Sequence, residues 1–396
     1  MRVRALALVV ALAVIASMCT AARAQQVVID PAANLTNMTM PMGIASYGIS
    51  NISADTGPYV VDTDEVVGVA RINGMLAYNA SLPATQNLSA YAASLQLNAV
   101  VDIAAQGGAL QYWLQDVIEF NTSNMTYYYT DNVWNVTTPT ANVSNATLIG
   151  GGGVLLSSTQ ALNGTWQNQT FYASASNLTL PLAYPETLIP VIALARNGTY
   201  PMVRMGYIQN GSYFFYDNVT IAAPGGAASM LVTPYQKTPA IDQANASYYD
   251  AELVFGGPSN QTMADFEYVN ATLWLGYAGD NGIEPFPYLA TFGSDTGETA
   301  QGISVRQGSG SAALGTGTPD YNATIVLASV PAELAGVQPV GNESVTAPST
   351  TNSTAHNAAQ PTPWPWYLAV ALAFVVAVAA ALHVVAGRHR ARKRHA

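Results

Sequence analysis

The stretch from residue 25 to residue 365 is poor in three residue types on which many enzymes rely. It contains no cysteine and one histidine, His356, and only five lysines and arginines stand against all 23 aspartates and glutamates of the chain. The five basic residues are Arg71, Arg196, Arg204, Lys237 and Arg306. Because His356 lies in a segment rich in threonine, asparagine and proline, the globular part can hold no Ser-His-Asp triad, no Cys-His pair and no imidazole metal cage. Acid–base chemistry there must use carboxyl groups.

The shortage of basic residues also bears on the pH at which the protein works. Many proteins unfold in acid because protonated carboxyls no longer balance their numerous lysines and arginines. Here, with every carboxyl protonated, the five bases, His356 and the N-terminus give a net charge of about +7 over roughly three hundred residues. The composition therefore predicts a protein that works in strong acid.

The beginning of the chain has the pattern of an export signal. A basic start is followed by an apolar run from Ala5 to Ser17 and by the A-x-A site at residues 22–24. This pattern predicts a signal peptide over residues 1–24, which leaves Gln25 first and removes Cys19, the single cysteine.

The end of the chain has the pattern of a membrane anchor. Leu368 to Ala386 is apolar apart from His383, and this is about the length that spans ~30 Å of hydrocarbon. Aromatic residues precede the run and five basic residues follow it. We predict a transmembrane helix over residues 366–387, a basic cytoplasmic tail over 388–396, and a large domain outside the plasma membrane at the cell surface.

Glycosylation sequons support this extracellular placement. Of the 27 asparagines, 22 begin Asn-x-Ser/Thr, which is more than the frequency of serine and threonine explains. The excess predicts a surface that carries N-linked glycans.

The chain between the two ends divides into a globular part and a stalk. Residues 25–341 are globular in composition, whereas residues 342–365 are rich in serine, threonine, proline and asparagine. Apolar residues of the globular part recur with a period of two, as from Leu95 to Ile103 and from Leu110 to Phe120 on either side of Gly107-Gly108, which predicts a β-hairpin. Further strands are expected over residues 127–136, 213–221, 248–255 and 265–277, and flexible loops over 150–153 and 308–317.

These patterns predict an all-β protein with sandwich-like antiparallel sheets, followed by one C-terminal transmembrane helix. A short internal echo leaves open an arrangement of two related lobes. Residues 128–133, Tyr-Tyr-Thr-Asp-Asn-Val, resemble residues 214–219, Phe-Phe-Tyr-Asp-Asn-Val.

Hydrolysis of an amide bond by carboxyl groups needs two of them sharing one proton, the ionised one to activate water and the protonated one to assist the carbonyl. Strand alternation places Asp250 and Glu252 on one face, about 6.5 Å apart, so that each could meet a third carboxyl across the strands. Asp116 lies on the apolar face of its strand, which would raise its pKa if it is buried. Asp131 shares its face with the sequon asparagine Asn135, which predicts that Asp131 faces solvent.

Two Asp-Thr-Gly triplets occur, at residues 55–57 and 295–297, and this triplet is the active-site phrase of pepsin-like proteases. In that family the phrase is followed by Ser or Thr, whereas here Pro58 and Glu298 follow. We interpret the first triplet as a plain turn and do not expect a pepsin fold.

Six phrases, taken together and in order, resemble the thermopsin family, the secreted acid proteases of heat-loving acidophilic archaea. The phrases are Pro41 to Gly48, Ser94 to Asn98, Tyr112 to Val117, Asp131 to Asn135, Tyr249 to Gly257 and Phe292 to Thr299. The resemblance implies an aspartic-type acid endopeptidase with protein or peptide substrates, no cofactor and no metal. Matching the acidic phrases of that family singles out Asp250, Glu252, Asp295 and Glu298 as candidate catalytic residues.

Two other functions fit parts of the sequence. A non-enzymatic surface glycoprotein, such as an envelope or adhesion module, would have the same signal, glycans and anchor, and a glycosidase would also use two carboxyls. No nucleic-acid partner is expected. Our hypothesis for the site is that Asp295, in the turn Gly293 to Gly297, faces the strand of Asp250 and Glu252, and that one carboxyl from each segment forms the proton-sharing pair.

Overall fold

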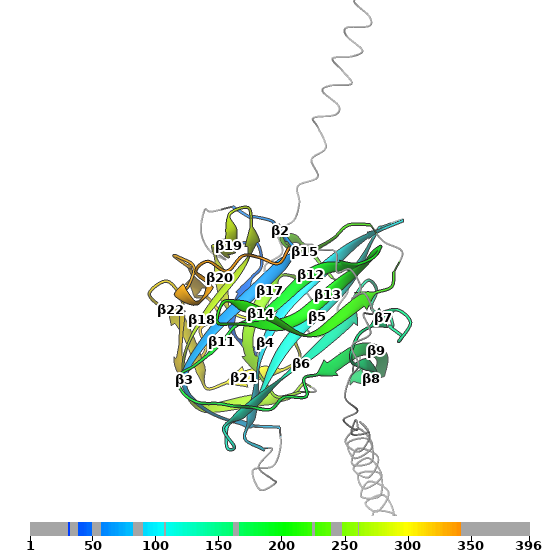
Figure 1. The fold of residues 1–396 in the computed structure, drawn as a ribbon. Helices are drawn as coiled ribbons and strands as arrows, with labels where there is room; N and C mark the ends of the chain where they lie inside the picture. The colour runs from blue at the N-terminus through cyan, green and yellow to red at the C-terminus, as the bar shows by residue number, and fades with distance from the viewer. Residues whose placement is uncertain are drawn as a thin grey trace, which may run out of the picture. The chain divides into compact units, whose positions relative to one another are not determined.

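The computed structural model describes residue 31 and residues 39–49, 57–81, 90–106, 108–160, 166–223, 226–238, 248–259 and 261–341 (Figure 1). The predicted signal peptide, stalk, transmembrane helix and cytoplasmic tail lie outside these residues. Within the described ranges, no helix is long and apolar enough to cross a membrane.

The described residues form two large sheets, so the all-β prediction is confirmed. The first sheet has 13 strands. Its main path runs β24 (Thr324–Ile325), β20 (Leu289–Phe292), β1 (Met42–Ser46), β17 (Ala251–Gly256), β4 (Ala92–Ala105), β5 (Gly108–Asn121), β6 (Thr126–Asn135), β9 (Trp166–Ala175) and β8 (Gly153–Gln160). Off this path lie β10 (Leu180–Pro181), β15 (Ala228–Lys237), β16 (Tyr248–Tyr249) and β2 (Val61–Thr63).

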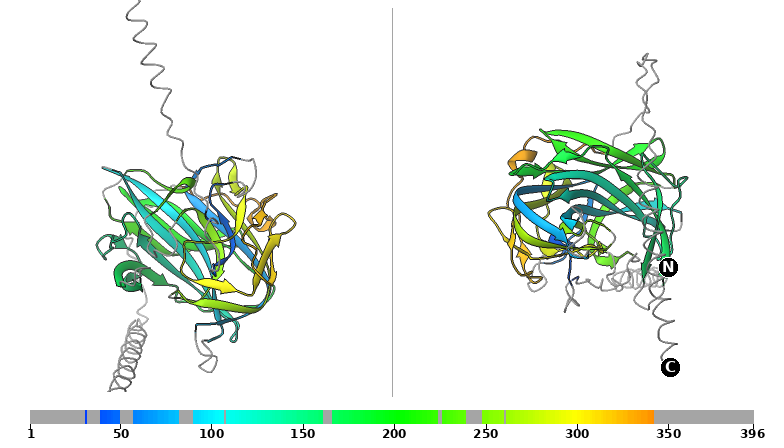
Figure 2. Two further views of the ribbon diagram at one scale, coloured as in Figure 1. Left: turned by 180° about the vertical axis from the view of Figure 1, so that it is seen from behind. Right: turned by 90° about the horizontal axis from the view of Figure 1, so that it is seen from below.

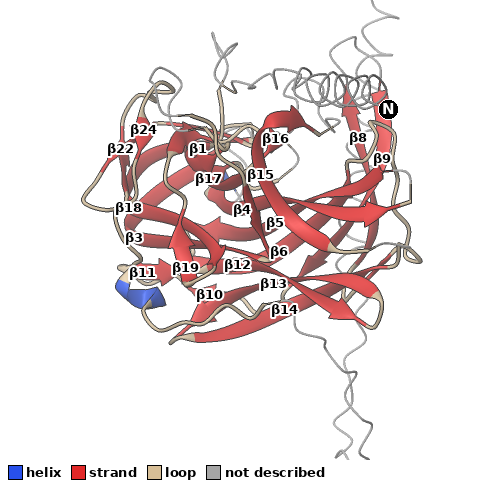
Figure 3. Ribbon diagram, turned by 90° about the horizontal axis from the view of Figure 1, so that it is seen from above, coloured by secondary structure: helices blue, strands red, loops and turns tan. Residues whose placement is uncertain are grey.

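The second sheet has 11 strands among the described residues. Its path runs β22 (Ile303–Gln307), β23 (Ala312–Thr316), β18 (Met263–Gly279), β3 (Glu65–Asn79), β12 (Pro190–Asn197), β13 (Tyr200–Gln209), β14 (Ser212–Ile221) and β7 (Leu148–Ile149), with β11 (Glu186–Leu188), β19 (Gly282–Pro285) and β21 (Thr299–Gln301) at its side. One short 3-10 turn, Ala332–Leu334, follows the last strand. The two layers can be followed from behind and below in Figure 2 and from above in Figure 3.

The hydrophobic core lies between the two sheets and follows the alternation in the sequence. Leu95, Leu97 and Ile103 of β4 belong to one buried cluster with residues of the second sheet such as Val67 and Ile192. Burial of each such side chain contributes about 1.5–3 kcal/mol. The intervening residues of β4, among them Gln96 and Asn98, therefore point to the opposite, outer face of the first sheet.

The predicted hairpin is confirmed, because β4 and β5 pair in register from Ala92–Asn121 to Ala105–Gly108. The prediction of a flexible loop over residues 308–317 is wrong for its second half. β22 and β23 form a hairpin there, with its turn closed by a 2.8 Å hydrogen bond from Gly308 N to Ser311 O. Its inward side chains, Ala312 and Leu314, are buried, and the frequent glycines hid this alternation. Likewise, residues 150–152 form a connection but Gly153 already belongs to β8.

The strand predicted over residues 248–255 is interrupted at Asp250. Tyr248 and Tyr249 pair with β15, whereas Ala251 to Gly256 pair with β1 and β4. The two segments of the internal echo are β6 and β14, one in each sheet.

Candidate active site

The candidate carboxyls Asp250 and Glu252 lie in the middle of the first sheet. Glu252 is on β17, directly opposite Ala45 of β1 on one side and Asn98 of β4 on the other. Asp250 occupies the break between β16 and β17. Since Leu253 and Phe255 point into the core, the alternation places Glu252 on the outer face.

The third carboxyl comes from the turn that follows β20. The Gly293 amide donates a 3.0 Å hydrogen bond to Pro41 O, which leads the chain past β1 towards β17. Asp250, Glu252 and Asp295 each place one carboxyl oxygen within 4.8 Å of the corresponding oxygens of the other two. All three side chains are buried, with 0%, 0% and 8% of their surface exposed. The structure therefore brings together three of the four carboxyls that the sequence singled out.

Four hydrogen-bond donors converge on the Glu252 carboxyl. Its Oε1 accepts from the amides of Ser294 at 2.6 Å and Asp295 at 3.2 Å, and from the Tyr47 hydroxyl at 3.4 Å. Its Oε2 accepts from the Asn98 side-chain amide at 3.1 Å. Donors of this kind stabilise an ionised carboxylate, and here they also tie the turn to β17.

The two aspartates have a different environment. Neither oxygen of Asp250 nor Oδ2 of Asp295 has a donor among the described residues, although all three atoms are buried. Oδ1 of Asp295 accepts a 2.7 Å hydrogen bond from the Tyr248 amide. Buried polar atoms are rarely left without a partner, and a proton carried by one aspartate and directed at the other would satisfy both.

Electrostatics favour this shared proton. Burial, and then the charges of Asp295 and Glu252, raise the pKa of Asp250 well above its usual value. Burial and the charge of Glu252 also raise the pKa of Asp295, although hydrogen bonds from Asp250 and Tyr248 and the charge of Lys237 act in the opposite direction. Asp250 has no comparable stabilisation of its charged form, so we assign the proton to Asp250.

Gly293 is required by the packing of this turn. A Cβ atom built at Gly293 would lie 2.7 Å from Glu252 Oε2, a separation that real Cβ atoms do not show. The glycine therefore lets the backbone of the turn approach the carboxyl closely.

The fourth candidate, Glu298, is not part of this cluster. It lies beside Gly256 at the far end of β17, about 13 Å along the strand from Glu252. It accepts hydrogen bonds from the Thr296 hydroxyl and, at 3.0 Å, from the Gln261 amide. Its acid neighbour there is Glu119, whose pKa is raised by burial and then by the charge of Glu298.

Tyr47 and Asn98 are site residues to which sequence reasoning gave no role. Both lie in phrases that carried the family resemblance, but their contact with Glu252 depends on strand register, which the local sequence does not reveal. Burial and the neighbouring carboxyls raise the pKa of Tyr47 well above its usual value, so its hydroxyl remains a donor.

Three carboxyl oxygens at this spacing could also hold a hard divalent cation if all were ionised. The donors on Glu252 and the raised pKa of both aspartates favour protons instead, most strongly in acid.

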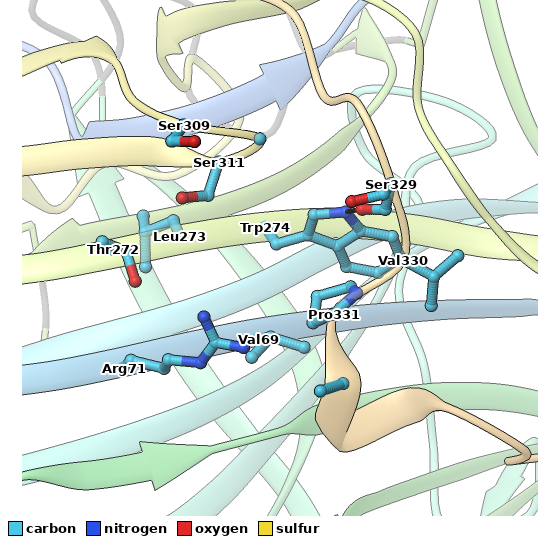
Figure 4. A pocket seen from close by; sticks show the side chains of 12 residues that line it. Val69, Arg71, Thr272, Leu273, Trp274, Ser309, Ser311, Ser329, Val330 and Pro331 are labelled. Carbon is cyan, nitrogen blue, oxygen red and sulfur yellow. Dashed lines mark hydrogen bonds between the residues drawn. The ribbon is translucent and has the colours of Figure 1, made fainter.

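A pocket on another part of the surface, between β3, β18 and residues 329–332, shares no residue with the cluster (Figure 4). Its lining holds Arg71, Trp274 and three serines but no carboxyl, so it offers no acid pair for hydrolysis.

Comparison with known proteins gives one consistent result. The family model described as Thermopsin matches residues 27–303, and these include every residue of the cluster. The chain is 32% identical over 281 residues to "Thermopsin" of Sulfolobus acidocaldarius, an alignment that covers 69% of this chain and 79% of that protein. The chain therefore belongs to the thermopsin family of acid proteases.

Proposed function

We propose that the chain is an acid endopeptidase in which Asp250 and Asp295 share one proton and activate a water molecule. The observation that carries this assignment is the unequal distribution of donors. Four donors reach Glu252, one reaches Asp295 and none reaches Asp250. The pair that must share a proton is thereby distinguished from the carboxyl that accepts most of the hydrogen bonds.

In the first step, ionised Asp295 takes a proton from water while the water oxygen bonds to the scissile carbonyl carbon. Asp250 gives its proton to the carbonyl oxygen, which produces a neutral gem-diol. In the second step, a diol hydroxyl returns its proton to Asp250, Asp295 gives its proton to the departing amine, and the carbon–nitrogen bond breaks. Both aspartates end in their starting protonation states.

In this proposal, Glu252 holds the catalytic turn in place. Its hydrogen bonds to the amides of Ser294 and Asp295 fix the backbone that carries the second aspartate. Its charge also opposes the simultaneous ionisation of both neighbours, which favours a pair that retains one proton.

In this proposal, an extended peptide substrate lies along the outer face of the first sheet beside the cluster. Trp113 of β5 lies opposite Trp134 of β6 on one side and Val100 of β4 on the other. Val100 follows Ala99, which pairs with Ala251, the residue after Asp250. Both indole nitrogens, and Asn98 Oδ1, are buried without a partner among the described residues. Substrate carbonyl and amide groups would supply the missing partners.

We further propose that the enzyme is exported, glycosylated and anchored at the cell surface by residues 366–387, as the sequence patterns predict. Among the described sequon asparagines only Asn79 is buried, which leaves the others accessible to a glycan. No observation on the described residues favours a glycosidase or a purely structural glycoprotein over a member of this peptidase family.

The test is hydrolysis of a denatured protein at pH 2–3 by the Asp250→Asn and Asp295→Asn variants. Each change keeps the shape of the side chain but removes the titrating oxygen. We expect both variants to remain folded and to lose about 10²–10⁴-fold in rate. Asp280→Asn, at an exposed position, is the matched control. Near-normal turnover by either variant would remove that aspartate from the pair.

A further inference from the structure

A second group of buried carboxyls lies between the two sheets and is not used by the proposed chemistry. Asp116 of β5 and Asp131 of β6 lie directly opposite each other in the first sheet. Asp217 of β14 approaches them from the second sheet, and its charge raises the pKa of Asp131. Asp131 and Asp217 occupy the same position in the echoed segments 128–133 and 214–219. All three are buried, with at most 3% of their surface exposed.

The burial of Asp131 corrects the prediction that it faces solvent. That prediction took its orientation from Asn135, which is the last residue of β6 and only partly buried. A sequon at a strand end does not fix the orientation of the strand interior.

Asp116 and Asp217 each accept a hydrogen bond from a tyrosine of the opposite sheet. The Tyr216 hydroxyl, from β14, lies 2.6 Å from Asp116 Oδ1 and 2.8 Å from Thr130 O and hydrogen-bonds there, so it joins the two sheets. Asp217 accepts from the Tyr172 hydroxyl at 2.5 Å and from the amides of Gly151 at 2.9 Å and Asn218 at 2.8 Å.

Asp131 has no such partners. Neither of its oxygens, nor Asp116 Oδ2, receives an N–H or O–H donor from the described residues. A proton on Asp131 directed at a neighbouring carboxyl would give these buried oxygens a partner. Ionised carboxylates facing each other on neighbouring strands would repel, and burial strengthens that repulsion.

We propose that Asp116, Asp131 and Asp217 form an acid-dependent latch, which holds the two sheets together while protons occupy the cluster and releases them as the pH rises. The latch is a regulatory device built into the fold and does not depend on the assignment of the catalytic pair. It would confine the protease to acid, because neutralisation weakens the protein itself.

The surroundings of the latch support this direction of pH dependence. Burial raises the pKa of Asp116 to about 8, although hydrogen bonds from Tyr216 and from the backbone of Val191 and Gly206 lower it. Burial, then the charges of Asp217 and Asp116, raise the pKa of Asp131 to about 9.

The other titratable groups around the latch offer no compensating positive charge. The facing phenols are Tyr129, Tyr172 and Tyr216, and burial raises the pKa of each, so they stay neutral. The charge of Glu186 raises the pKa of Tyr129 further. The base from the neighbouring strand, Arg204, lies 3.7 Å over the ring of Phe215, and its charge lowers the pKa of Glu65.

The sign of the effect follows from linkage. A carboxyl whose pKa is raised in the folded state contributes stability in full below the unfolded value of about 4. That contribution is lost as the pH rises towards the folded value, here about 8 for Asp116 and about 9 for Asp131.

The test compares the full-length protein with its Asp131→Asn variant from pH 3 to pH 9, using near-ultraviolet circular dichroism to record the melting temperature. We expect similar melting temperatures at pH 3 and a smaller decline in the variant between pH 5 and pH 9, because the amide cannot ionise. Asp280→Asn is the control and should follow the wild type. A variant that declines in parallel with the wild type overturns the latch, as does a folded variant that has lost hydrolysis at pH 3.

A second measurement keeps the proposal testable if Asp131→Asn does not fold. Asp116→Asn leaves an acceptor for the Tyr216 hydroxyl, and its infrared difference spectrum against the folded wild type at pH 6 reports the state of the missing group. A protonated-carboxyl band in that difference supports the latch. A carboxylate band at the same pH overturns it.

Discussion

The two buried carboxyl clusters of this protein resemble each other in chemistry and differ in their place in the fold. In each, one member accepts several hydrogen bonds, Glu252 in one and Asp217 in the other, and one member, Asp250 or Asp131, accepts none from the described residues. Both arrangements favour a retained proton. Proton sharing alone therefore does not distinguish an active site.

The two clusters differ in the backbone that carries their carboxyls. Asp116, Asp131 and Asp217 lie within β-strands, Asp217 beside a register shift of β14 against β13, and point into the space between the sheets. Asp250 occupies a break between two strands, and Asp295 lies in a glycine-containing turn on the outer face. Irregular backbone allows close approach of a substrate, whereas a regular inter-sheet position links two layers.

The largest expected effect in this comparison is that of Glu252→Gln. In the variant an amide nitrogen replaces one carboxyl oxygen and would face donors, so some of the four hydrogen bonds that Glu252 accepts would be lost. We expect the free energy of unfolding to fall by about 2–4 kcal/mol at pH 3, together with a loss of about 10²-fold or more in hydrolysis. Chemical denaturation and a peptide assay measure the two effects. Glu267→Gln, at an exposed position, should change neither.

Gly293→Ala tests the close approach at the catalytic turn. The new methyl group would overlap the Glu252 carboxyl and displace the turn by a fraction of an ångström or more. We expect kcat to fall by about 10- to 100-fold with an unfolding cost of about 1–3 kcal/mol. In Gly153→Ala the methyl group meets no atom within 4 Å, so that variant is the control. Unchanged kcat in Gly293→Ala would show that the position of the turn is not critical.

The pH dependence of stability tests both clusters together. The pKa values of Asp116, Asp131 and Asp250, the member of the catalytic pair to which the shared proton is assigned, are raised, so their stabilisation is complete below about pH 4 and declines above it. Between its unfolded and its folded pKa, each of these groups lowers the free energy of unfolding by about 1.4 kcal/mol per pH unit. The melting temperature should be nearly constant between pH 2 and pH 4 and should fall from there to pH 9. A steep loss between pH 4 and pH 2 would contradict this account.

The smallest expected effect concerns an ordinary surface ion pair. Arg71 and Glu333 form a hydrogen-bonded pair whose side chains are 42% and 31% exposed. The hydrogen bond lowers the pKa of Glu333, so the pair contributes above the usual glutamate pKa and is lost as the pH falls. Glu333→Gln should therefore cost less than about 1 kcal/mol at pH 6 and nothing at pH 2. A comparable cost at pH 2 would show that the side chain acts through packing.

The sequence predicts the sheets and the three clustered carboxyls better than it predicts what surrounds them. Alternation of apolar residues gave the β4–β5 hairpin, and the acidic phrases gave Asp250, Glu252 and Asp295. The donors Tyr47 and Asn98 were not predicted, because they reach Glu252 across neighbouring strands whose register depends on the whole sheet.

Errors arose where a local marker was used to orient a larger element. Asn135 misled the orientation of Asp131 because it lies at the end of its strand. The glycines of residues 308–317 suggested a loop, although Ala312 and Leu314 bury an alternating face. The meeting of Asp131 with Asp217 depends on the packing of two sheets, and the echoed segments alone did not reveal it.

The two carboxyl clusters can be separated by the rate of peptide hydrolysis at pH 3 of folded Asp295→Asn and folded Asp131→Asn, measured side by side. Assignment of the chemistry to the Asp250–Asp295 pair implies a loss of about 10²–10⁴-fold for Asp295→Asn and a rate close to that of the wild type for Asp131→Asn. An active Asp295→Asn enzyme together with an inactive Asp131→Asn enzyme would contradict it and would place the chemistry between the sheets.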